Sequence, residues 1–292
     1  MMNNIAVIFS WNIWNDLQDM WQYPFMRHAF EAGTVVAIVA GIVGYFVVIR
    51  RLSFAAHALS HIGFAGAAGA VLAGINPLLG LIGFTAGGGL AMAGLGRKAA
   101  SQDVQIGTVL AFMLGLGVLF ISLYKGYATE AYSILFGEIL GISTGDVWLT
   151  AFFGLIIVVV VTTMYRRLLF TSLDEDVAEA KGTSLLGTSI VFMLILALAT
   201  SMSVQVVGVL LIFALMVTPA AIAQRLAYKP SQGIAIAVIC SLLATWVGLF
   251  ASYYLPYPVS FFIVTFIFSI YVLVRLIQAF SHRQKKTLIK SI

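Results

Sequence analysis

Charged residues are scarce in this sequence. Only 9% of its 292 residues are Asp, Glu, Lys or Arg, whereas an average soluble domain carries about 25%. This scarcity excludes an ordinary soluble enzyme and a disordered chain. The net charge of +5 comes from 16 basic and 11 acidic residues, which does not fit a nucleic-acid binder with its clustered basic face. The single cysteine, Cys240, cannot form an internal disulfide.

Several catalytic motifs are also missing. The sequence contains neither a G-x-x-x-x-G-K-[ST] phosphate loop nor an H-E-x-x-H zinc-protease motif. Residues 141–145 match G-x-S-x-G, but Ser143 is predicted at the outer membrane face and His61 at mid-depth, so a serine hydrolase lacks its base. We therefore predict that the chain is not an enzyme.

Long apolar runs fill most of the sequence, of which 61% is hydrophobic. The runs are continuous rather than alternating, which favours membrane helices over a β-barrel. The predicted fold is an all-α polytopic bundle of about eight or nine transmembrane helices. Segment 129–141 is apolar but too short to cross and is predicted to be re-entrant or interfacial. The expected spans are 30–49, 54–74, 78–96, 106–124, 147–165, 185–202, 204–226, 233–253 and 257–275.

The basic residues predict the orientation of this bundle. All of the 16 except Arg27 and Lys125 fall on one side of the predicted spans, and the positive-inside rule makes that side cytoplasmic. The N-terminus is then outside and the C-terminus cytoplasmic. We divide the chain into an interfacial segment (1–28), a transmembrane domain (29–277) and a basic cytoplasmic tail (278–292).

Two histidines, His57 and His61, lie inside the second predicted span. Their i, i+4 spacing places both imidazoles on one helix face. At about 1.5 Å per residue, His61 lies roughly 15 Å beyond Arg51, near the middle of the membrane core. Neutral imidazoles are suitable zinc ligands, and Ser60 offers an additional oxygen. The alternative is that both histidines only bond to neighbouring helices.

Polar residues near the membrane surfaces are further candidates. Glu138 and Asp146 are predicted to face outward, where they attract cations, dock a basic partner or serve as ordinary surface acids. On the cytoplasmic side, loop 166–184 has the pattern of a short helix that Ser172 caps and Gly182 ends. This helix is either a docking element or a simple connection.

Taken together, these residues resemble the membrane subunits of bacterial ATP-binding-cassette importers for zinc, manganese and iron. The resemblance runs from residue 23 to about residue 276, and its motifs match in order and spacing. The motifs are RRLSF at 50–54, ALSHIGFAGAAGA at 58–70, DVQIGTVLAF at 103–112, LFGEILGIS at 135–143, VVGVLLIFALMVTPAAIAQRL at 206–226 and SYYL at 252–255.

The resemblance implies a multi-pass permease of the bacterial inner membrane that works as a homodimer. Two copies of a cytoplasmic ATPase would drive it, and an extracytoplasmic metal-binding protein or lipoprotein would deliver the metal. No permanently bound cofactor is implied. The implied ATPase-coupling residues are Leu173, Asp174, Glu175, Asp176, Val177, Ala178, Glu179, Ala180, Lys181 and Gly182.

The resemblance also implies the metal-binding positions. The family's D-x-x-x-H motif aligns its histidine with His61, whereas His57 replaces its aspartate. Two imidazoles favour zinc over manganese, so we expect zinc as the transported ion. The alternatives are a manganese or iron importer of the same family and a stand-alone carrier coupled to cations or protons.

Overall fold

The computed structural model describes residues 13–94, 99–124, 137 and 139–290, and all regular structure in these residues is helical. Nine of the described helices, all except α1 and α8, are long and apolar enough to cross a membrane, which confirms the predicted fold class. The helices are α1 Ile13–Gln22, α2 Pro24–Ile49, α3 Ser53–Leu72, α4 Pro77–Gly94, α5 Ala99–Leu123, α7 Thr144–Leu173, α8 Glu175–Ala180, α9 Leu185–Val207, α10 Val209–Leu226, α11 Pro230–Tyr254 and α12 Val259–Lys290.

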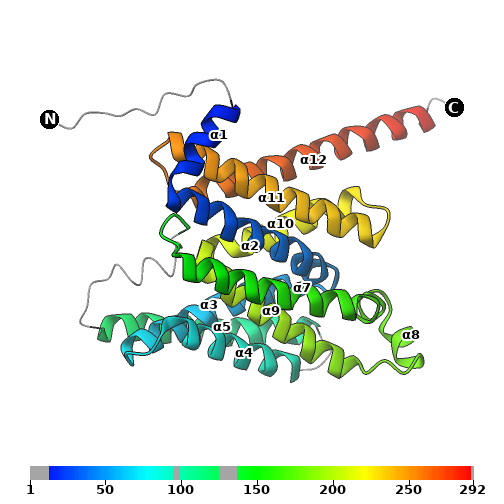
Figure 1. The fold of residues 1–292 in the computed structure, drawn as a ribbon. Helices are drawn as coiled ribbons and strands as arrows, with labels where there is room; N and C mark the ends of the chain where they lie inside the picture. The colour runs from blue at the N-terminus through cyan, green and yellow to red at the C-terminus, as the bar shows by residue number, and fades with distance from the viewer. Residues whose placement is uncertain (1–12, 95–98, 125–136, 138, 291–292) are drawn as a thin grey trace.

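The long helices form two groups (Figure 1). In one group α3 packs against α4, α5 and α9, and in the other α2 packs against α10 and α11, with α12 outside them. Helix α7 contacts both α2 and α9 and so connects the groups. Helices α2, α3 and α9 are mostly buried, whereas α5 and α12 are mostly exposed. The histidine-bearing helix α3 is therefore central in the bundle.

Glycines allow α3 to approach α4 very closely. A Cβ atom added to Gly66 would collide with the carbonyl oxygen of Gly80, and a Cβ at Gly80 would collide with that of Gly66. Association between membrane helices relies on close van der Waals packing, because lipid is as apolar as the helix surface. This reciprocal contact therefore fixes α3 against its neighbour.

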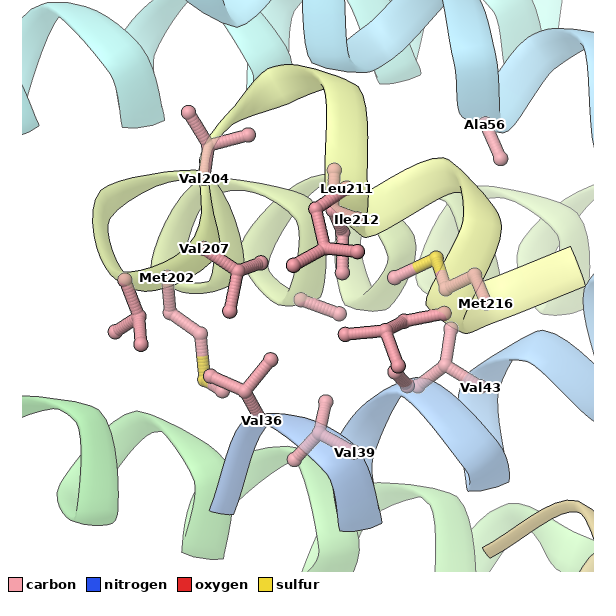
Figure 2. Packing of buried hydrophobic residues seen from close by; sticks show 14 of the residues in the cluster. Val36, Val39, Val43, Ala56, Met202, Val204, Val207, Leu211, Ile212 and Met216 are labelled. Carbon is pink, nitrogen blue, oxygen red and sulfur yellow. The ribbon is translucent and has the colours of Figure 1, made fainter. Parts of the chain in front are cut away.

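The apolar core lies between α2, α9 and α10. Figure 2 shows valines of α2 pointing toward Met202 and Val207 of α9 and toward Leu211 and Met216 of α10. Each of these side chains is at most 2% exposed. Close packing of this kind holds the junction of α9 and α10 against α2. The α2 valines are Val36, Val39 and Val43.

The break between α9 and α10 lies at Gly208, not near residue 203 as the predicted spans had it. Gly208 has φ +82° and ψ 165°, a combination that is essentially restricted to glycine. Thr200, Ser201 and Ser203, next to the predicted break, are all buried in α9. Helix α9 therefore continues through its polar residues and ends only where the backbone requires glycine.

Pro219 lies inside α10 and is buried, as its position in the predicted span implies. Proline lacks the N–H that would donate to the carbonyl four residues earlier, here that of Leu215. The hydroxyl of Ser241 on α11 donates to that carbonyl at 3.3 Å. A side chain of the neighbouring helix thus satisfies a backbone acceptor that lipid could not.

Two other boundaries differ from the prediction. Helix α7 ends at Leu173 rather than near 165, because Arg166 and Arg167 extend the helix instead of ending it. Helix α2 begins at Pro24, inside the segment expected to be interfacial. Most of segment 129–141 lies outside the described residues. The three-part division of the chain and the orientation in the membrane stay predictions.

Candidate metal pathway

His57 and His61 lie on one face of α3, as their spacing predicts. Their ring centroids are 4.7 Å apart and the rings are nearly perpendicular, at 84°. Both side chains are half-buried. Two imidazoles at this separation on one rigid helix can approach a common ion without backbone rearrangement.

One ring nitrogen of each histidine has no observed partner. The Nδ1 atoms of both histidines are enclosed and have no hydrogen-bond partner among the described residues. A buried polar atom without a partner costs free energy, and such atoms in a native structure commonly mark a functional site. Both Nδ1 atoms therefore lack a partner that would explain their burial among the described residues.

A third ring contacts the histidines from another helix. The centroid of Phe213 on α10 lies 4.9 Å from that of His57, and the rings are inclined by 62°. The aromatic contact restricts the orientation of His57. Phe213 had no signal in the sequence, because nothing distinguishes it from the other phenylalanines of the predicted spans.

Ser60 is less suited to bind an ion. It is 1% exposed, and its hydroxyl donates to the carbonyl of His57 at 2.7 Å. Among the described residues no group of three or more His, Cys, Asp or Glu side chains comes together. One copy of the chain thus provides two imidazoles, which is half of a tetrahedral zinc site.

Asp146 contributes to the stability of the N-terminal end of α7. It forms a capping box with Ser143, and its Oδ1 accepts a hydrogen bond from Gln205 Nε2 of α9 at 2.8 Å. The carboxylate therefore accepts a hydrogen bond from the backbone at the start of α7 and links α7 to α9. Glu138, the other predicted outer acid, lies outside the described residues.

The same capping box bears on the G-x-S-x-G match. The hydroxyl of Ser143 donates to Asp146 Oδ2 at 2.6 Å. The nearby imidazole of His28 contacts the Ile142 carbonyl and the Thr144 hydroxyl, at 3.1 and 3.2 Å. Ser143 is thus the N-cap of α7, which agrees with the prediction that residues 141–145 are not the nucleophile motif of a serine hydrolase.

A short helix, α8, does form in the loop that was predicted to be cytoplasmic, but Ser172 does not cap it. Asp174 is the N-cap and accepts a hydrogen bond from the Val177 N–H at 3.0 Å, whereas Ser172 lies in α7 and bonds to the Leu168 carbonyl. The sequence-based cap was wrong because α7 is longer than predicted. Gly182, with φ +77°, ends α8 as predicted.

The surface of α8 is suited to contact with another protein. Leu173 is 64% exposed and Val177 is 43% exposed, whereas Ala178 is buried and attaches the helix to the bundle. Asp174, Asp176 and Glu179 are exposed around these apolar side chains. Apolar residues within a charged rim are typical of an interface.

The fold defines a multi-pass membrane protein whose central helix carries a pair of histidines. Residues 22–278 match the ABC 3 transport family, and the chain belongs to this family. It is a permease subunit of a bacterial membrane transporter and not an enzyme. The resemblance inferred from the sequence motifs is thereby confirmed.

Known relatives cover most of the chain. The manganese transport system membrane protein MntC of Listeria monocytogenes is 32% identical over 238 residues, which are 81% of this chain and 85% of the relative. The manganese import system permease protein ScaB of Streptococcus gordonii is 31% identical with the same two coverages. The solved structure of PsaBC from Streptococcus pneumoniae in complex with Fab has a TM-score of 0.80 at 29% identity, covering 90% of this chain and 95% of that chain.

Proposed function

We propose that this permease subunit imports a divalent transition-metal ion past His61 and His57, and that a separate cassette ATPase supplies the energy. The observation that carries the proposal is the histidine pair on α3, with rings 4.7 Å apart and both Nδ1 atoms without a partner. The names of the relatives support metal import as the function of the family. Family membership also favours an ATP-driven importer over a stand-alone carrier.

Zinc is the ion that this donor set favours. Imidazole nitrogen binds zinc more tightly than manganese in the Irving–Williams order, whereas manganese prefers carboxylate oxygen. Among the described residues, no Asp or Glu joins His57 and His61 to form a group of three possible metal ligands. Weak binding by two neutral ligands suits a transported ion, which must leave the site again.

Manganese is the second candidate, and the relatives favour it. Both MntC of Listeria monocytogenes and ScaB of Streptococcus gordonii are named as manganese transport proteins. A manganese permease would need oxygen ligands beside the histidines, from water, from a second copy of the chain or from residues outside the described ranges.

A homodimer would complete the pathway. His57 and His61 are only half-buried by their own chain, so their face is open to a further element. Two copies related by a two-fold axis would each carry one such pair, and the second copy would cover the face that the first leaves open. The exposed apolar surfaces of α5 and α12 leave large areas for contact with lipid or with the second copy.

The partners of an importer would bind at opposite ends of the bundle. We place the ATPase at α8, where Leu173 and Val177 are exposed. A metal-delivering protein would dock on the outer face, near the N-terminal end of α7. Asp146 lies there, but its hydrogen bonds to Ser143 and Gln205 make a stabilising role its main contribution.

Competition between metals tests this proposal. The permease and its ATPase would be reconstituted in vesicles, and ATP-dependent uptake of radioactive zinc would be measured against unlabelled zinc, manganese and iron. We expect zinc to compete most strongly. Stronger competition by manganese would select the second candidate, and uptake that does not depend on ATP would contradict the importer assignment.

A further inference from the structure

Arg50, the C-cap of α2, joins three helices through one side chain. Its Nη1 donates to Thr171 Oγ1 of α7 at 3.3 Å, and its Nη2 donates to Ser189 Oγ of α9 at 3.0 Å. The guanidinium carbon lies 4.9 Å from the ring centroid of Phe192 on α9. Thr171 can accept because its own hydroxyl hydrogen is directed to the Arg167 carbonyl, at 2.9 Å.

These two acceptors lie on either side of α8. Helix α7 leads into α8 and α9 leads out of it, so Thr171 and Ser189 belong to the two stems of the predicted ATPase-docking helix (Figure 1). Thr171 is 4% exposed and Phe192 is fully buried. The guanidinium thus links both stems through partly buried hydrogen bonds, for which water competes less than at an exposed surface.

The backbone that follows Arg50 is fixed by two hydrogen bonds to the end of α2. The Arg51 N–H donates to the Val48 carbonyl at 3.2 Å, and the Leu52 N–H donates to the Val47 carbonyl at 2.8 Å. Arg51 has φ +58° and is the only described non-glycine residue with a positive φ. This is a Schellman turn with arginine where glycine is usual, and α3 starts directly after it, at Ser53.

The turn makes a short and stiff path from Arg50 to the ion site. His57 lies seven residues beyond Arg50, and the helical part of that path rises about 1.5 Å per residue. A displacement of either stem of α8 therefore pulls on the guanidinium, and the hydrogen-bonded turn passes the movement to the start of α3.

We propose that Arg50 is a positioning residue that transmits movement of α8 to the His57–His61 pair and so couples ATP hydrolysis to metal movement. The inference rests on the proposed function, since it takes α8 as the docking site of the ATPase. A purely structural role would instead make Arg50 necessary for folding alone. The two roles differ in whether the loss of Arg50 separates hydrolysis from transport.

The test compares Arg50→Gln with Arg51→Gln, which removes the neighbouring exposed guanidinium of the same turn. In reconstituted permease–ATPase complexes we expect Arg50→Gln to retain ATP hydrolysis and to lower metal uptake per ATP by about tenfold. Arg51→Gln should leave that ratio unchanged. Arg50→Lys, which keeps the charge but not the fork geometry, should fall between them.

A second readout does not depend on which metal is transported. His61→Cys is introduced with Cys240→Ala, and its labelling by a thiol reagent is compared with and without ATP and vanadate. We expect a nucleotide-dependent change in labelling that Arg50→Gln abolishes and Arg51→Gln preserves. If wild-type vesicles import no metal but this pattern holds, the proposed function fails and the role of Arg50 stands.

The double variant Thr171→Val with Ser189→Ala removes the two hydroxyl groups that accept hydrogen bonds from Arg50. It replaces Arg50→Gln as the test if that variant does not fold. It should reproduce the loss of coupling and add nothing to Arg50→Gln. The inference is overturned if either change leaves uptake per ATP and the labelling difference intact, or if the labelling difference is absent without any substitution. It is also overturned if uptake and hydrolysis fall in the same proportion.

Discussion

The ring of Phe213 on α10 packs against that of His57 on α3, with 4.9 Å between the centroids. The contact joins the proposed ion site to α10, the helix that follows Gly208 and contains Pro219. Phe213 therefore determines how freely the His57 imidazole can rotate, which in turn determines how well both histidines are arranged for one ion.

Phe213→Ala should weaken metal binding during transport. Aromatic pairs contribute about 0.5–1.5 kcal/mol beyond simple burial, so we expect the apparent KM for metal to rise roughly two- to tenfold. Initial uptake rates over a range of zinc concentrations measure this change. Phe213→Tyr keeps the ring and should behave like the unmodified protein, and an unchanged KM in Phe213→Ala would show that the contact does not orient His57.

His57→Asp should shift selectivity toward manganese. The substitution restores the carboxylate found in the family motif, adds negative charge and replaces a nitrogen ligand by oxygen, which manganese prefers. We expect the ratio of manganese to zinc uptake to rise by about tenfold or more. Competitive uptake of the two metals measures the ratio, with His57→Asn as the uncharged control. A ratio that does not change would contradict the ligand argument for zinc.

The fold and the histidine pair could be predicted from the sequence because both follow from local periodicity. Continuous apolar runs predicted the membrane-crossing helices, and the i, i+4 spacing predicted the shared face of His57 and His61. The contacts of Phe213 and Arg50 could not be predicted, because they join residues distant in the chain, such as Arg50 and Ser189. Tertiary packing alone decides such pairs.

The errors in helix ends have a similar origin. The predicted break near residue 203 falls among polar residues, but Thr200, Ser201 and Ser203 are buried in α9 against other helices. Thr85 of α4, for example, shares a 2.6 Å hydrogen bond with Ser201. A partner on another helix makes a polar residue tolerable inside the membrane, and the sequence does not reveal that partner.

Val177→Asp should detach the ATPase. Val177 is an exposed apolar residue of α8, and a charge placed inside an apolar contact is costly to desolvate. We expect the amount of ATPase that copurifies with the permease to fall by about tenfold or more. Tyr228→Asp is the control, because Tyr228 is 97% exposed in the loop after α10, on the same predicted face. Equal retention of the ATPase by both variants would refute docking at α8.

Gly208→Ala should destabilise the junction of α9 and α10. Its backbone, with φ +82° and ψ 165°, costs about 1–3 kcal/mol for a residue with a side chain. We expect a lower midpoint of unfolding in detergent, followed by the fluorescence of the native tryptophans. Gly83→Ala is the matched control, since an added Cβ there has no neighbour within 4 Å. If the unfolding midpoint of Gly208→Ala equals that of Gly83→Ala, the backbone at Gly208 is not strained by a side chain.

The central claim is that the ion passes the two imidazoles of α3, and the most direct measurement is ATP-dependent metal uptake by the variant His57→Ala with His61→Ala. Ser60→Ala is the control, because the Ser60 hydroxyl is already bonded to the His57 carbonyl. The account predicts that uptake falls to background in the double variant while ATPase binding and expression persist, and that Ser60→Ala transports normally. Uptake at the wild-type rate in the double variant would show that the ion takes another route.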